Sequence, residues 1–167
     1  MAAVLAVAGA FPAFAVGEQA MSDIKGRDGK EIGKIVLIET TVGVLIKVKL
    51  SGLKPGPHGF HLHEVGRCDG DFSSAGKIYN PLGARHGFLS EEGPMVGDLP
   101  NLFAGATGEV EAEILSPFVT LSKDAEESLL DLDGTSFVIF ENGDDYKSDP
   151  EGEAGARIAC GVIAAVK

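Results

Sequence analysis

The stretch IGKIVLIETTVGVLIKVKL, residues 32–50, decides the fold class. We expect two strands in it, over residues 32–40 and 42–50. In the second, the alternating apolar positions are Val42, Val44, Ile46, Val48 and Leu50. An apolar residue at every second position is typical of a strand with one buried face. The stretch therefore predicts an antiparallel hairpin that lies half in the core.

The rest of the chain also reads as strands. Glu109, Glu111 and Glu113 alternate with apolar residues, which predicts a strand with an acidic solvent face. Residues 136–140 and 157–162 are apolar runs of strand length, and residues 123–132 could form one or two helical turns. The segments 65–101 and 141–156 are long loops rich in Gly, Pro and Asp. The pattern favours an all-β sandwich or barrel with two long loops.

Composition supports one folded domain and excludes some partners. A chain of 167 residues, 44% of them hydrophobic, is one domain's worth of protein with a sizeable core. Its 23 glycines favour many short elements joined by turns. The net charge of −11 repels nucleic acid and anionic lipid. We therefore expect no nucleic-acid partner.

The first residues look like an export signal. Residues 1–15 carry no charge and end in Ala13-Phe14-Ala15, the small-x-small pattern of a cleavage site. Pro12 interrupts the run, which is also too short to span a bilayer. We expect residues 16–167 to form the folded domain, exported to a periplasm, the extracellular space or a thylakoid lumen, with no membrane span after signal removal. An apolar N-terminal arm is the alternative, and the lack of a basic residue after Met1 fits an incomplete signal.

Cys68 and Cys160 are the two cysteines of the chain. With an export signal they suggest one disulfide in an oxidising compartment, and two buried free thiols are the alternative. A bridge would close a loop of about 90 residues and stabilise the fold by roughly 4 to 5 kcal/mol at most.

His61 and His63 stand two residues apart in GFHLHE. In a strand, positions i and i+2 project from the same face, so two imidazoles would lie side by side. Such a pair is half a metal site. On its own it is equally typical of two hydrogen-bonded histidines.

Several segments together carry a family resemblance. They are HGFHLHEVGRC (58–68), SAGKIYNP (74–81), HG (86–87), GDLPN (97–101), DDYK (144–147) and GARIACGVI (155–163). In this order and spacing they resemble copper/zinc superoxide dismutases, particularly the exported bacterial type, over about residues 18–167. The resemblance implies an eight-stranded Greek-key β-barrel, an antioxidant role, and a disulfide between Cys68 and Cys160.

The resemblance also implies a metal site, and this chain lacks half of its histidines. In the family, four histidines hold a redox-active copper, and one of them bridges to a zinc held by two more histidines and an aspartate. His61 and His63 resemble copper ligands, His86 and Asp98 zinc ligands, Asp144 the carboxylate that orients ligands of both metals, and Arg157 the residue that attracts superoxide. The other three ligand positions are occupied by Ile78, Met95 and Phe140.

These replacements shape the functional prediction. Ile and Phe offer no lone pair, and a thioether hardly binds zinc, so zinc is not expected and copper is possible only at His61 and His63. We expect a superoxide dismutase-like protein with a degenerate site and little or no dismutase activity. It would act as a structural or binding subunit, docked on a photosynthetic or respiratory membrane complex or another protein partner. The alternatives are a residual copper-dependent dismutase of superoxide that uses Arg157, and a copper carrier that adds Met95.

Overall fold

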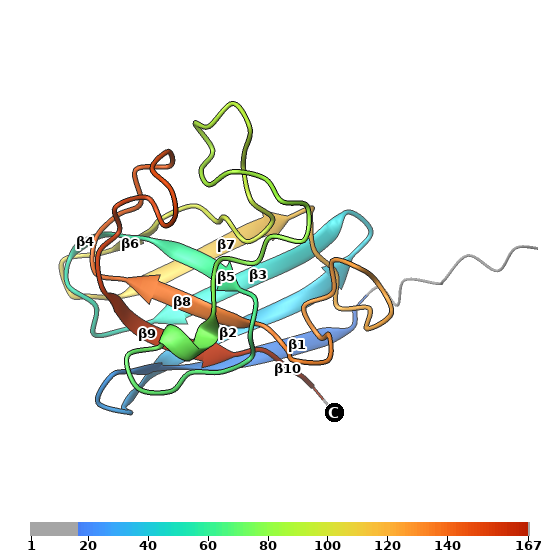
Figure 1. The fold of residues 1–167 in the computed structure, drawn as a ribbon. Helices are drawn as coiled ribbons and strands as arrows, with labels where there is room; N and C mark the ends of the chain where they lie inside the picture. Colours follow the sequence, from blue (N-terminus) through green and yellow to red (C-terminus); the bar gives the residue numbers. More distant parts are fainter. Residues whose placement is uncertain (1–16, 167) are drawn as a thin grey trace, which may run out of the picture.

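The computed structural model describes residues 17–166, so the predicted signal segment 1–15 lies outside the described residues. Figure 1 shows a fold of strands and loops. A 3-10 turn, η1 (Ser73–Ala75), interrupts the first long loop. The strands are β1 (Gln19–Gly26), β2 (Glu31–Thr40), β3 (Gly43–Leu50), β4 (Gly56–His58), β5 (Phe60–His63), β6 (Leu102–Ala104), β7 (Val110–Ser116), β8 (Ser136–Phe140), β9 (Arg157–Val162) and β10 (Ala164–Ala165).

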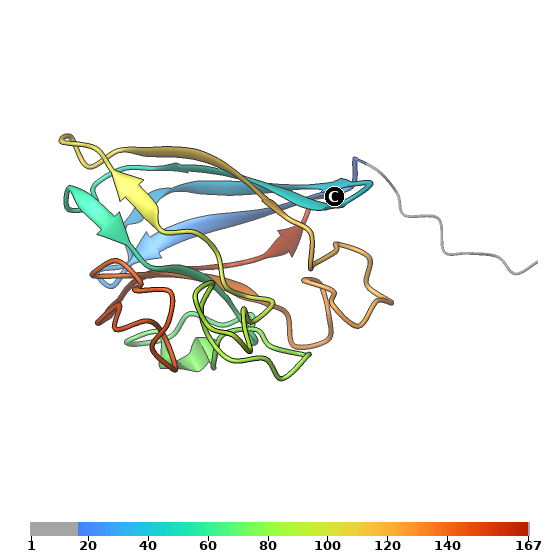
Figure 2. The ribbon, with the colours of Figure 1, turned by 90° about the horizontal axis from the view of Figure 1, so that it is seen from above.

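One large sheet curls around the core. Its strand order is β5-β8-β9-β1-β2-β3-β7, with β10 paired to β1, and β4 pairs with β6 in a second small sheet. Figure 2 shows two layers, with β1, β2, β3 and β7 in one and β5, β8 and β9 in the other. Only Gly59 separates β4 from β5, and its N–H still donates to the carbonyl of Asn142. The predicted all-β barrel architecture is therefore confirmed.

The hairpin of residues 32–50 forms as predicted, with one exception. Val44, Ile46, Val48 and Leu50 point into the core, where each is at most 3% exposed. Val42, predicted to be the first inward residue, is 59% exposed. The prediction was wrong there because residues 41–42 form the turn and β3 begins at Gly43, which has a φ of +119°.

Of the other elements, some match the predictions and two do not. Strands β8 and β9 have the expected bounds, and Glu111 and Glu113 lie exposed on β7. Strand β1 was not predicted, because its inner face includes the polar Ser22 and gives little hydrophobic signal. The helical turns over residues 123–132 were wrong. The N–H of Leu129 donates to the carbonyl of Thr120, which folds this segment back as a loop.

Both predicted long loops are present and determine where the site lies. In Figure 2 the segments 65–101 and 141–156 cover the outer side of the β5–β8–β9 layer. Every residue of β5 and β8 is consequently buried, since the barrel core covers one face and the loops cover the other. The disulfide between Cys68 and Cys160 is confirmed and ties the first loop to β9. No helix in residues 17–166 is long and apolar enough to cross a membrane.

Candidate metal centre

Strand β5 divides its residues between two environments. Phe60 and Leu62 point into the barrel core, and His61 and His63 project from the opposite face, beneath the long loops. Both histidines are fully buried, and their ring centroids lie 6.4 Å apart. The i, i+2 spacing of the strand thus places the two imidazoles side by side in a buried space between strand and loops.

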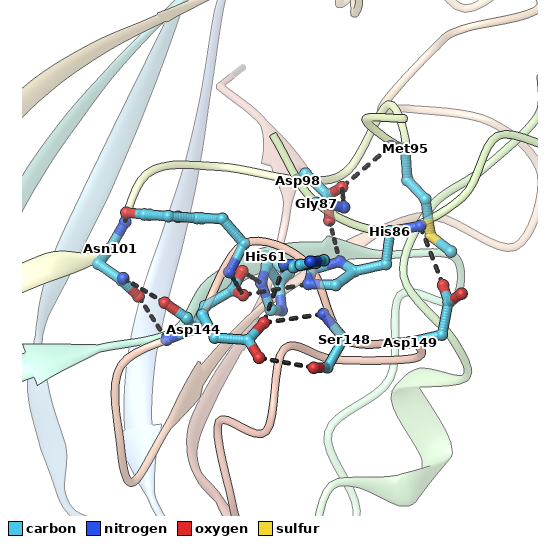
Figure 3. A network of polar contacts seen from close by, with 12 residues as sticks. His61, His86, Gly87, Met95, Asp98, Asn101, Asp144, Ser148 and Asp149 are labelled. Atoms are coloured by element: carbon cyan, nitrogen blue, oxygen red, sulfur yellow. Dashed lines mark hydrogen bonds and ion pairs between the residues drawn. The ribbon is translucent and has the colours of Figure 1, made fainter. Parts of the chain in front are cut away.

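Asp144 joins this strand to the zinc-ligand side of the site (Figure 3). Its Oδ2 lies 2.9 Å from Nε2 of His61, and its Oδ1 lies 3.1 Å from Nε2 of His86. Asn101 fixes the aspartate through its backbone. The Asn101 side chain donates to the Asp144 carbonyl at 2.9 Å and accepts from the Asp144 N–H at 2.8 Å. Asp144 is therefore held rigidly between two imidazoles.

His86 lies between two carboxylates. Its Nδ1 is 2.7 Å from Oδ1 of Asp98, and its Nε2 faces Asp144. The second oxygen of Asp98 accepts the backbone N–H groups of Gly87 and Met95. A neutral imidazole has only one N–H, so bonding to both carboxylates requires His86 to carry a proton on each nitrogen.

The electrostatics agree with this assignment. Burial alone would lower the pKa of His86, but the hydrogen bonds to Asp144 and Asp98 outweigh it and raise the pKa to about 10. Burial likewise opposes ionisation of Asp144, yet the hydrogen bonds from His61 and His86 hold the pKa of this carboxyl well below its usual range. At neutral pH the network is an imidazolium between two carboxylates.

On the zinc side, two of the residues that could hold the ion bond directly to each other. His61, His86 and Asp98 offer ligand atoms within 4.8 Å of one another. Zn–N and Zn–O bonds of 2.0 to 2.2 Å at a tetrahedral angle would separate a nitrogen and an oxygen by about 3.4 Å. The Nδ1 of His86 and the Oδ1 of Asp98 are 2.7 Å apart and form a direct hydrogen bond instead. The neighbouring positions, Ile78 and Met95, supply no further imidazole.

Two imidazole nitrogens nearby are left without a partner. Nδ1 of His61 and Nε2 of His63 are buried and form no hydrogen bond with the described residues. The other nitrogen of His63 bonds to the Gly76 carbonyl at 3.1 Å. Burial, helped by the charge of Arg157, lowers the pKa of His63 to about 3, so its Nε2 keeps its lone pair. Two bare imidazole nitrogens on one strand face are suitable ligands for a copper ion.

The three residues at the lost ligand positions lie around the same space. Phe140 is fully buried, with its ring centroid 5.1 Å from that of His61 and 6.0 Å from that of His63. Ile78 is 3% exposed and pairs with His63 in an isolated β-bridge. Met95 is only half-buried and lines a groove at the surface. Packing thus replaces imidazole at two of the three positions.

Arg157 lies at the mouth of this region but is not free. Its guanidinium donates to the carboxylate of Glu151 and to the carbonyl of Phe72, the latter at 2.9 Å. Its Cζ also lies 6.0 Å from the centroid of the Phe140 ring. A groove of about 500 Å³ beside it is also lined by Glu64 and Lys77. The two acidic and two basic side chains of the groove therefore balance in charge. An anion approaching Arg157 meets a guanidinium that is already paired.

Sequence reasoning missed two residues of this site. Asn101 ends the quoted GDLPN motif, and its position three residues after Asp98 could have suggested a role in the network. Glu151 belongs to an acidic loop stretch, and nothing in the sequence indicated that it faces Arg157. His58 lies behind the site, with one ring nitrogen 2.7 Å from the Phe140 carbonyl and the other 2.8 Å from that of Lys54. It holds the end of β8 in place.

Comparisons with known proteins agree with this architecture. The sequence profile of a family described as copper/zinc superoxide dismutase matches residues 32–163. Superoxide dismutase [Cu-Zn] 1 of Aquifex aeolicus is 49% identical over 144 residues, which cover 85% of each chain. The superoxide dismutase-like protein YojM of Bacillus subtilis is 43% identical over 140 residues, which cover 82% of this chain and 71% of that one.

Solved structures give the same result. A superoxide dismutase-like protein from Bacillus subtilis, in a double mutant with two introduced histidines, matches with a TM-score of 0.83 at 42% identity, over 85% of this chain and 95% of that one. The Cu/Zn superoxide dismutase from Brucella abortus matches with a TM-score of 0.72 at 34% identity, over 88% of this chain and 100% of that one.

Proposed function

This chain belongs to the copper/zinc superoxide dismutase family, and we propose that it is a member with a degenerate metal site and little or no dismutase activity. The observation that carries the proposal is the contact between His86 and Asp98. Their 2.7 Å separation, together with Ile78, Met95 and Phe140 at the other ligand positions, leaves zinc without a site.

The chemistry of the remaining residues argues against rapid turnover. Bound copper would supply one-electron transfer to and from superoxide, and here only His61 and His63 offer it nitrogen ligands. Both of these ligands come from one strand, so they fix neither the coordination number nor the geometry through a redox cycle. Arg157, paired with Glu151, adds little attraction for an anion on a chain of net charge −11.

The role that fits this scaffold is structural or binding. Its proton-bridged network stabilises the two long loops in the way a structural metal would, so the fold does not need metal to stay closed. The disulfide and the apolar residues 1–15 support an exported protein, released after Ala15 into a periplasm, the extracellular space or a thylakoid lumen. Docking on a membrane complex is part of the proposal, and recovery from native membranes only as a free monomer would contradict it.

Metal content and activity test the proposal together. The chain from residue 16 onward is exposed to stoichiometric copper and zinc, desalted, and measured by elemental analysis and by a superoxide assay. We expect no retained zinc and no copper-dependent dismutation. The Ile78→His, Met95→His and Phe140→His triple variant is the matched comparison and should retain both metals. Fast dismutation by the unaltered chain would refute the proposal and establish the residual dismutase.

A second candidate function is copper binding without turnover. The two unpartnered nitrogens of His61 and His63 favour it, because two imidazoles can hold Cu(I) without further ligands. Half-buried Met95 would add a soft thioether if it reaches the ion. Titration with Cu(I) against a competing chelator should give one site per chain, abolished by His63→Ala and retained in His58→Gln. Equal copper retention by the His63→Ala variant would exclude this site.

A further inference from the structure

A second polar feature lies far from the histidines, at the end of the barrel where the β2–β3 turn meets the segment after β7. In Figures 1 and 2 this is the end at which the described chain begins. A groove of about 490 Å³ opens here, and Glu39 of β2 is one of its lining residues. Glu39 is only 4% exposed, which is unusual for a carboxylate. This groove plays no part in the site described above.

The Glu39 carboxylate bonds to the described residues through one oxygen only. Its Oε2 accepts the Leu121 N–H at 2.6 Å and the Thr120 hydroxyl at 3.2 Å. Its Oε1 accepts no hydrogen bond from the described residues, and no lysine, arginine or histidine lines the groove. A second acid, Glu127, lines the same groove. Oε1 is not enclosed by the protein, so it is the oxygen that a positive partner in the groove could reach.

The rim of the groove is apolar and exposed. Val42, Leu82 and Phe118 come from three separate parts of the chain and are 59%, 66% and 51% exposed. Three large apolar side chains around an acidic floor resemble the usual composition of a recognition site, in which apolar walls surround a few polar groups. A single ammonium group would leave these three apolar side chains exposed. A ligand that covers them would carry apolar residues on either side of its cation.

We propose that this groove binds a lysine side chain of a partner protein, flanked by apolar residues. Lysine fits better than arginine because an ammonium is a point donor that one oxygen can satisfy. A guanidinium prefers both oxygens of a carboxylate, and the Leu121 N–H already occupies one. The inference gives the proposed binding role a partner of defined chemistry, but it does not depend on the state of the metal site.

NMR titration of the ¹⁵N-labelled chain from residue 16 onward tests it. The probe is the peptide acetyl-Ala-Leu-Lys-Leu-Ala-amide, and the matched probes carry norleucine or arginine in place of lysine. We expect the lysine probe to shift the amides of Val42, Gly43 and Ala125. Glu39→Gln keeps an acceptor for Leu121 and should weaken binding roughly tenfold or more. Glu111→Gln removes the same charge from the solvent face of β7 and should leave the affinity unchanged.

Several outcomes would overturn the proposal. Equal affinity of the Glu39→Gln variant, or equal binding of the norleucine probe, would show that the carboxylate recognises no cation. Stronger binding of the arginine probe would contradict the single-oxygen argument. The lysine probe could also shift no amides in the chain from residue 16 onward and yet shift them in a chain that begins at Gly17. That result would mean that the N-terminal residue of the longer chain fills the groove. If Glu39→Gln does not fold, Phe118→Ser provides the test, because loss of the exposed ring should weaken the lysine probe and leave the fold intact.

Discussion

Replacing Asp144 with asparagine should be among the most destabilising single changes at this site. The Asp144 carboxylate accepts three hydrogen bonds, from His61 at 2.9 Å, from His86 at 3.1 Å and from the Tyr146 N–H at 2.6 Å. Asparagine keeps one oxygen. If that oxygen stays with His86 and Tyr146, the new NH₂ group faces the N–H of His61, and two donors oppose each other.

The magnitude follows from what remains after the substitution. His86 keeps its proton and its bond to Asp98 but loses one of the two carboxylates that balance its buried charge. Removing one partner of a buried ion pair typically costs about 3–5 kcal/mol. For a domain of this size that corresponds to a fall in Tm of roughly 6–20 °C.

Urea denaturation in the presence of a metal chelator measures this cost. Unfolding is followed at pH 7 for the unaltered chain, for Asp144→Asn, and for Asp124→Asn. Asp124 is an exposed carboxylate that forms no hydrogen bond with the described residues, so its substitution should change stability by less than about 0.5 kcal/mol. If Asp144→Asn is no more destabilising than this control, the network does not hold the loops, and the argument for a metal-free closed site fails.

Three further predictions concern charge, access and the disulfide. Because the pKa of His86 is raised to about 10, its stabilising contribution is complete below about pH 6.5 and is lost as the pH rises through 10. Unfolding free energy should therefore fall by about 1.4 kcal/mol per pH unit between pH 7 and 9, and the fall should be absent in His86→Gln. Glu151→Gln should release Arg157, so the variant with three restored histidines should dismutate superoxide faster with this change than without it, most clearly at low salt. Reducing the Cys68–Cys160 bridge, whose cysteines are 92 positions apart, should lower stability by roughly 4 kcal/mol in urea titrations, and an unchanged midpoint would contradict the loop-closure estimate.

Local patterns in the sequence predicted several of the barrel strands. Residues 43–50 were predictable because their apolar residues face the core at a period of two, and β8 and β9 because they are short apolar runs of strand length. The first strand was not, because an inner face of Ala20, Ser22 and Ile24 looks polar and small when read alone. The turn at Val42 depended on the close approach of Gly43 to Ser116, a contact between residues far apart in the chain.

The site was predictable in its residues but not in its contacts. The resemblance named His61, His86, Asp98 and Asp144, and the structure places them in one network. It could not say that His86 and Asp98 would meet directly, because a sequence does not tell whether a lost metal leaves space or lets the ligands close. Nor could it pair Glu151 with Arg157, since the approach of these residues depends on the path of the loop between them.

If the site is degenerate, as we propose, the contact between His86 and Asp98 explains how the fold can persist without zinc. A zinc ion holds its ligands by charge and fixed geometry, and it pins the loop that contains them to the barrel. A doubly protonated His86 carries one positive charge and donates one N–H to Asp98 and the other to Asp144. These two hydrogen bonds hold the loops without the third and fourth ligands that a zinc ion would need. Ile78 and Met95 stand where the family has two ligand histidines, and the hydrogen-bonded network around His86 does not require an imidazole at either position. Charge balance is then retained without zinc, which is the physical basis of our proposal that the scaffold persists while dismutase activity is low.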